Sequence, residues 1–328
     1  MVFGTLESDP AYEKMIKNKL KKLKKYSVFE IIIDSVKDFG KNDSITFAAS
    51  TAFYTIFSLP ALLIIILNIA SVILNEDTVK EELLAQVSKM MGSESATTLE
   101  GVMTNVAISG QTLYSRIVAI SVLIFSATTV FVSLQNSINH IWHIRSKPEK
   151  GFLKYIMNRI LSFSMVASIG FLLLVSLLAD AFIVILLNYF SDIFDTGTLK
   201  LASVINFLVT QSTFVLVFGL MYKILPDAKV KWKDVWLGAF VTMILFGLGK
   251  FLIGLYLGSA DVGSYYGTAG SLVVVLIWVY YSVVIFLFGA QLTYYIAENI
   301  GGHVTPIKEA VKVRLIEITD EEEEEEGD

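Results

Sequence analysis

The stretch YYGTAGSLVVVLIWVYYSVVIFLFGAQLTYYIAE, residues 265–298, decides the class of this protein. No charged residue occurs between Gly270 and Ala297, and that run is longer than the roughly 20 residues that cross the hydrocarbon core of a bilayer. A tyrosine pair near its end, Tyr294 and Tyr295, suits the level of the lipid head groups. A buried helix of a soluble protein is the alternative for this stretch alone. Because several other stretches have the same character, we predict a membrane-spanning helix.

Composition supports the same class. The chain has 328 residues, of which 54% are hydrophobic and 17% are charged, whereas soluble domains carry about 25% charged residues. Cysteine is absent, which excludes disulfides, thiolate metal sites and cysteine nucleophiles. The formal net charge of −5 owes much to one acidic run, Glu321–Glu326, and such runs are usually solvated tails. The sequence therefore predicts an integral membrane protein.

The hydropathy pattern predicts an all-α integral membrane protein with six transmembrane helices, an N-terminal amphipathic helix and short external interfacial helices. Residues 1–44 form a basic amphipathic segment, expected on an anionic membrane surface. Residues 45–298 form the membrane domain, with an external segment at 74–115, and residues 299–328 form an acidic tail expected to be disordered. The six apolar runs lie at roughly 45–73, 116–139, 160–189, 201–222, 236–258 and 270–297.

The distribution of basic residues predicts the orientation. Of the 26 Lys and Arg residues, 21 fall in the N-terminal segment, the 140–159 and 223–235 loops and the C-terminal tail, all on one predicted side. The other predicted side holds Lys80, Lys89, Arg116 and Lys200. The positive-inside rule then places both termini in the cytoplasm.

Polar residues at helical spacing within the apolar runs are the candidate site. A polar side chain in a bilayer needs a partner away from lipid, so several such stripes indicate either a water-filled cavity or a hydrogen-bonded core. The sequence leaves both alternatives open. The residues expected to line a cavity are Tyr54, Gln135, Asn139, Asn206, Thr210, Trp278 and Ser282.

Two charged residues lie inside the apolar runs, Asp180 and Lys250. At 1.5 Å of rise per residue both fall in the outer half of the bilayer, and we expect them to face the interior and to pair. They form either a structural ion pair or a substrate or proton site. Two residues that snorkel independently to the interface are the third possibility.

Catalytic signatures are weak throughout the sequence. The histidines are His140, His143 and His303, with no HExxH motif and no cysteine ligand, so we expect no metal site, no cofactor and no enzymatic activity. The fragment Gly247-Leu-Gly-Lys250 lacks the spacing and the Ser or Thr of a phosphate-binding loop. The lysine-rich N-terminal segment also carries Glu13, Glu30, Asp34 and Asp38, so nucleic acid is not expected as a partner.

Four stretches together resemble the YihY/BrkB family of bacterial inner-membrane proteins, some of which were once labelled ribonuclease BN. Each stretch alone is a weak match. Their order and spacing make a specific set, and together the four stretches cover about residues 28–300. They are Phe47–Tyr54 with Ser58-Leu-Pro60, then Ser133–Trp142, then Leu225-Pro226 with Trp232, Gly238-Ala239 and 250–256, and finally Tyr266-Gly267 through Trp278 and Tyr280 to Gly289–Thr293. Family members often have Glu where this chain has Gln291.

The resemblance implies a multi-pass protein of the bacterial inner membrane. It implies a transporter or exporter that handles a lipid or other amphiphile, with membrane lipids as partners and a homo-oligomer as a possible state. A non-transporting scaffold or envelope-integrity protein is the alternative. The ribonuclease label does not fit, because metal-dependent RNA cleavage needs a ligand cluster that the sequence lacks.

Overall fold

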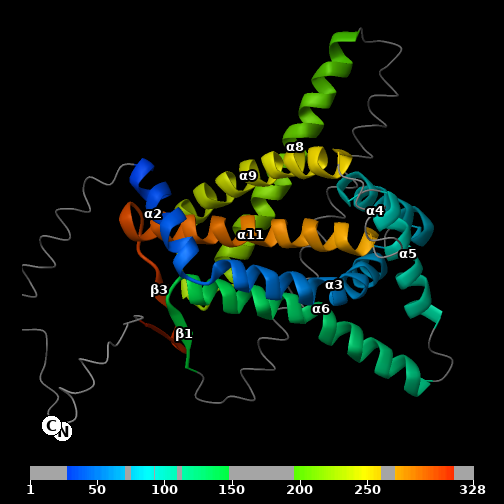
Figure 1. Cartoon of the computed structure of the whole chain (residues 1–328), viewed down its shortest axis with the longest axis horizontal. Helices are drawn as coiled ribbons and strands as arrows, with labels where there is room; N and C mark the ends of the chain where they lie inside the picture. Colours follow the sequence, from blue (N-terminus) through cyan, green and yellow to red (C-terminus); the bar gives the residue numbers. More distant parts are fainter. Residues whose placement is uncertain are drawn as a thin grey trace, which may run out of the picture.

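A computed structural model describes residues 28–70, 75–91, 93–108, 113–147, 196–259 and 270–313. Helix α11 (Gly270–Asn299) runs through the centre of the bundle and packs against α3 (Ser44–Ala70) on one side and α9 (Trp232–Ser259) on the other. Helix α6 (Leu113–Ile141) lies along α3, and α8 (Thr196–Ile224) crosses α9 (Figure 1). The described part of the stretch quoted at the outset, from Gly270 onward, is therefore the centre of the fold.

Membrane character is evident in the long helices. In the described part of the chain, three helices are long and apolar enough to cross a bilayer, over Phe207–Ile224, Trp232–Ile253 and Leu272–Asn299. Helix α9 presents a stripe of exposed apolar side chains, which a soluble protein would bury or use as an interface. These side chains are Leu237, Phe240, Ile244, Leu248, Phe251, Leu252 and Leu255. The predicted run at 160–189 lies outside the described residues.

Small residues allow the backbones of α9 and α11 to lie close together. A Cβ atom on Gly238 would clash with the Thr293 side chain and lie 3.3 Å from its Cα atom. Reciprocally, a Cβ atom on Gly289 would clash with Thr242 and Tyr222. Such small-residue contacts let backbones approach closely where lipid offers no hydrophobic driving force. The two helices therefore meet through paired glycine and threonine positions.

One end of the bundle, which we call the strand end, carries two short strand pairs (Figure 1). Strand β1 (Ile144–Ser146), directly after α6, pairs antiparallel with β4 (Ala310–Lys312). Strand β2 (Ala228–Lys229), between α8 and α9, pairs with β3 (Thr305–Pro306). The described residues of the 140–159 and 223–235 loops and of the C-terminal segment thus lie together at one end of the molecule.

The strand pairs correct one expectation. The tail was expected to be disordered from residue 299, but residues 305–312 form β3 and β4 and contact distant loops. Their backbone groups find partners in β1 and β2, which removes the cost of leaving them unpaired. Residues 314–328, which include the acidic run, lie outside the described residues.

Helix α2 (Val28–Lys41) lies across the strand end of α11. Its inner face buries Ile31 against Leu292 and Ile296. Its outer face exposes Phe29, Ile32 and Val36, of which Phe29 is 69% exposed. This apolar outer stripe fits a helix that rests in the head-group region of a membrane.

The opposite end, which we call the hairpin end, is covered by α4 (Glu76–Met91) and α5 (Ser93–Ile108) (Figure 1). The two helices lie within the segment 74–115, where the sequence predicted two short amphipathic helices. An apolar cluster joins them to α3, and its members are Leu63, Leu67, Val79, Leu83, Leu99 and Met103.

Candidate functional site

Asp227 is the centre of a buried hydrogen-bond network at the strand end. It lies in the turn between α8 and β2, and it is 4% exposed. Its carboxylate accepts hydrogen bonds from Asn139 Nδ2 at 3.1 Å, from Gln135 Nε2 at 3.4 Å and from the Ser146 hydroxyl. Its own backbone N–H donates to Asn139 Oδ1 at 2.8 Å. One carboxylate therefore joins α6, β1 and the α8–β2 turn.

The backbone of the same residue extends the network to the C-terminal strands. Ile307 N–H donates to the Asp227 carbonyl oxygen at 3.1 Å. Close by in the fold, Trp142 is fully buried and donates from Nε1 to the Ala290 carbonyl of α11 at 2.9 Å. Buried polar groups cost free energy unless they are hydrogen-bonded. These bonds therefore hold the ends of α6 and α8 and the C-terminal strands in one arrangement, with Trp142 tied to α11 at Ala290.

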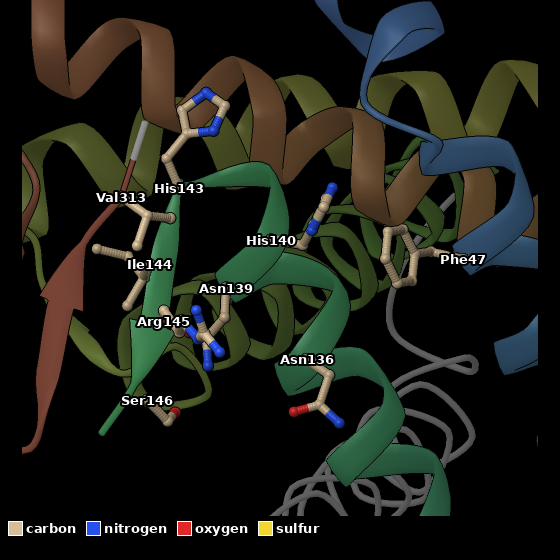
Figure 2. A pocket seen from close by; sticks show the side chains of 9 residues that line it. All are labelled: Phe47, Asn136, Asn139, His140, His143, Ile144, Arg145, Ser146 and Val313. Carbon is tan, nitrogen blue, oxygen red and sulfur yellow. The ribbon is translucent and has the colours of Figure 1, made fainter. Parts of the chain in front are cut away.

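A pocket of about 560 Å³ lies beside this network, between the end of α6, strand β1 and the start of α3. Figure 2 shows the side chains that line it, and we call it the α6–β1 pocket. Its described lining consists of Phe47, Asn136, Asn139, His140, His143, Ile144, Arg145, Ser146 and Val313. The pocket thus shares Asn139 and Ser146 with the Asp227 network.

The end of α6 shapes this pocket through its backbone. His143 N–H bonds to the His140 carbonyl at 3.0 Å, and His143 has a positive φ of 54°. A residue in this left-handed conformation ends a helix and turns the chain away from its axis. The turn leads directly into β1, so three successive residues, Ile144, Arg145 and Ser146, line the same space.

The polarity of the pocket is mixed and its formal charge is positive. Phe47, Ile144 and Val313 supply apolar surface, whereas Arg145 supplies a cation. None of the described lining residues is acidic. Burial lowers the pKa of the His143 imidazole below its ordinary value of 6.5, and the neighbouring His140 lowers that pKa further. The pocket can therefore hold a molecule with a polar, electron-rich part and an apolar part.

The predicted cavity-lining residues fall into separate environments. Gln135 and Asn139 are buried on Asp227, and Asn139 also lines the pocket. Trp278 is 2% exposed and packs against Phe246 with ring centroids 5.8 Å apart. Ser282 donates to the Trp278 carbonyl at 2.8 Å, within its own helix.

The remaining predicted positions do not join this group. Thr210 is half-buried on α8, and Asn206 lies on α8 with its side chain outside the described part. Tyr54 is 44% exposed, although the sequence led us to expect it in the interior. Lipid-facing and protein-facing sides of a helix can be equally apolar, so a single polar residue is a weak guide to the buried side.

The predicted pair of Asp180 and Lys250 remains a prediction. Asp180 lies outside the described residues. Lys250 is exposed on α9, next to the exposed Phe251 and Leu252, and not in the interior that we expected. A long lysine side chain can lie along apolar surface and reach a polar layer, which fits this outward position.

Sequence reasoning did not single out Asp227. It follows the motif Leu225-Pro226, but it stands among the lysines of the 223–235 loop, where a carboxylate resembles an ordinary solvated charge. The usable signal was the pair of amides on α6, Gln135 and Asn139, which need buried partners of their own. Nothing in the local sequence shows that the partner is Asp227.

Comparison with known proteins shows that the chain is similar to membrane proteins of several bacteria. It is 26% identical over 220 residues to a UPF0761 membrane protein of Verminephrobacter eiseniae (strain EF01-2), covering 66% of this chain and 49% of that protein. It is 27% identical over 248 residues to one from Stenotrophomonas maltophilia (strain K279a), covering 75% and 56%. The chain spans about half the length of these curated relatives. No solved structure matches it.

The family model agrees with these relatives and covers more of the chain. It is described as Virulence factor BrkB, and it matches residues 35–314. That range includes the Asp227 network and every residue of the α6–β1 pocket. The resemblance found in the sequence is thereby confirmed, and this chain belongs to the Virulence factor BrkB family of membrane proteins.

Proposed function

We propose that the chain is a transporter-like membrane protein that binds a lipid or other amphiphile in the α6–β1 pocket. The observation that supports this most is the composition of the pocket: an aromatic ring from α3 and aliphatic side chains from β1 and the C-terminal segment, with amide, hydroxyl, imidazole and guanidinium groups beside them. A ligand pocket typically combines apolar walls with a few placed polar groups.

The level of the pocket supports the same proposal. Phe47 lies in the first turn of α3, and Asn136 and His140 lie in the last two turns of α6. Helix ends of membrane spans lie near the head groups of the bilayer. A lipid could therefore place its polar part in the pocket while its chains stay in the membrane.

We include in the proposal six spans with both termini in the cytoplasm of a bacterial cell. Helices α3, α6, α8, α9 and α11 have 27 to 30 residues each, and at 1.5 Å per residue each is about 40 Å or more in length. The predicted run at 160–189 would be the sixth. Reporter fusions at Gly110 and Gly327 test the orientation, and an external signal from Gly327 would contradict it.

The second candidate is a scaffold that transports nothing. Many interior polar groups are bonded to one another, as in the Tyr222 hydroxyl, which lies 2.9 Å from Thr242 Oγ1 and donates to the Phe286 carbonyl. In this alternative the polar residues only hold the bundle together, and enzymatic activity is absent in both candidates.

Native mass spectrometry of gently purified protein separates the two candidates. We expect an amphiphile to remain bound to the wild type and to be lost in Asn136→Trp, which fills the pocket from an exposed lining position. Ser121→Trp is the matched control, because Ser121 is exposed on the same helix and lies about 22 Å away at 1.5 Å of rise per residue. Wild-type protein that retains no amphiphile would favour the scaffold.

A further inference from the structure

We infer that the α6–β1 pocket recognises a phosphate-bearing head group, and that Arg145 is its principal charge partner. This inference rests on the proposed function, because it assigns a chemical class to the polar part of the amphiphile. The ligand class is a phosphate monoester or diester, carried by a lipid that enters the pocket with its head group.

The first support is the balance of charge. The pocket is lined by one guanidinium, two imidazoles and the exposed amide of Asn136, and no described lining residue is acidic. Asp227 does not line the pocket, and its carboxylate already accepts from Asn139 and Ser146, which stand between the two regions. A lining that offers hydrogen-bond donors and a positive charge, with no carboxylate, favours an anion over a cation.

The second support is the type and setting of the cation. Arginine presents several N–H donors in a planar arrangement that matches two oxygens of a phosphate. Arg145 is exposed, whereas its neighbour Ile144 is buried and fixes the strand. The backbone of Arg145 pairs with Val311 in the β1–β4 ladder. The guanidinium therefore extends from a strand that is fixed by the buried Ile144 and by its pairing with β4.

The third support is the way the pocket is closed. Val313 N–H donates to the His143 carbonyl at 2.8 Å, which holds the C-terminal segment against the end of α6. Phe47 packs against His140 on the opposite side, with ring centroids 4.8 Å apart. Apolar groups thus border the donors, and a low-dielectric border strengthens an ionic hydrogen bond relative to open water.

A general basic surface is the competing explanation, because many cytoplasmic loops of membrane proteins are rich in Lys and Arg. Lys147 separates the two explanations. It is exposed, it follows β1 two residues after Arg145, and it does not line the pocket. Neutralising either residue removes the same charge from the same loop, but only Arg145→Gln removes a donor from the pocket.

The experiment measures ligand retention by the full chain in a neutral detergent. Three probes are titrated: dioctanoyl phosphatidic acid, dioctanoylglycerol, which has the same chains and no phosphate, and inorganic phosphate. We expect the wild type and Lys147→Gln to retain phosphatidic acid equally and Arg145→Gln to bind it about tenfold more weakly, because an ionic bidentate contact is lost. Arg145→Lys, which keeps the charge without the planar donor group, should fall between them.

Each outcome has one meaning. Equal binding of phosphatidic acid by the wild type and Arg145→Gln, or an equal loss in Lys147→Gln, overturns the role of Arg145. Equal binding of phosphatidic acid and dioctanoylglycerol overturns the phosphate class but leaves amphiphile binding intact. Binding of phosphate alone, without either lipid, supports the anion site and contradicts the proposed function. A thermal unfolding transition equal to that of the wild type shows that each variant is folded.

Discussion

Both ends of the bundle contain buried apolar side chains, but only the strand end adds a buried polar network among the described residues. At the strand end, Asp227 collects hydrogen bonds from α6 and β1 in a buried setting. At the hairpin end, α4 and α5 pack on α3 through an apolar cluster, and their ion pair between Lys80 and Glu100 lies at the surface. Apolar packing tolerates small shifts, whereas a buried polar network requires a specific geometry. The α6–β1 pocket, for which we propose a ligand, lies at the end that contains the polar network.

The largest expected effect is the loss of the Asp227 carboxylate. Asp227→Ala leaves the buried donors of Gln135, Asn139 and Ser146 without this acceptor, so we expect the free energy of unfolding in detergent to fall by about 4 kcal/mol. Asp227→Asn, which keeps one acceptor oxygen, should lose less. The control is Glu81→Gln, an exposed acid on α4. Equal stability of Asp227→Ala and the control would show that the strand end depends on packing alone.

A cavity at the hairpin end should lower the free energy of unfolding somewhat less than Asp227→Ala does. Leu99 is 6% exposed within the apolar cluster, and Leu99→Ala is expected to lower the free energy of unfolding by about 3 kcal/mol. Lipid retention should stay unchanged, because the α6–β1 pocket lies at the other end. Thr104→Ala, an exposed position on α5, is the control. A loss of ligand in Leu99→Ala would mean that the two ends are coupled.

A smaller effect is expected from pH at the strand end. Because burial and His140 lower the pKa of His143 below 6.5, the unfolded chain binds a proton there at a higher pH than the folded chain does. Stability from this residue is therefore fully present well above pH 6.5, begins to fall near about pH 6.5, and is lost as the pH falls through the lower pKa of the folded protein. His143→Asn tolerates the positive φ and should reduce the slope of stability between about pH 7.5 and about pH 5.5. An unchanged slope would contradict the burial of this imidazole.

The smallest effect is expected from the ion pair at the hairpin end. Lys80 Nζ lies 2.8 Å from Glu100 Oε1, but the two side chains are 34% and 44% exposed. A double-mutant cycle with Lys80→Gln and Glu100→Gln should give a coupling energy of less than about 0.5 kcal/mol, and about 1 M salt should remove it. A larger, salt-resistant coupling would make the two ends less different than we describe.

The sequence predicted the helices better than their orientation about their axes. The last apolar run was expected at 270–297 and the helix spans Gly270–Asn299, because length and lack of charge are sufficient to identify a span. Tyr54 and Lys250 were expected inside but are exposed. In a membrane protein, the lipid-facing side carries no polar signal that would mark it.

Only part of the candidate site could be predicted from the sequence. Gln135 and Asn139 were expected to line a cavity, since an amide inside a span needs a partner, and both are buried in the structure. Asp227 and the strands β3 and β4 were not, because each depends on contacts between segments far apart in the chain. A two-residue strand has too few residues to show an alternating pattern.

The β1–β4 ladder also has a consequence for biogenesis. Ile144 pairs with Lys312, and Lys147 N–H donates to the Glu309 carbonyl at 2.8 Å. Translation delivers β1 to the membrane long before β4, with α8, α9 and α11 still to be synthesised. The wall of the pocket that contains Val313 therefore forms only after the last helix has been inserted. A nascent chain at any earlier stage lacks this wall, so the ligand binding that we propose would have to wait until the last helix is inserted.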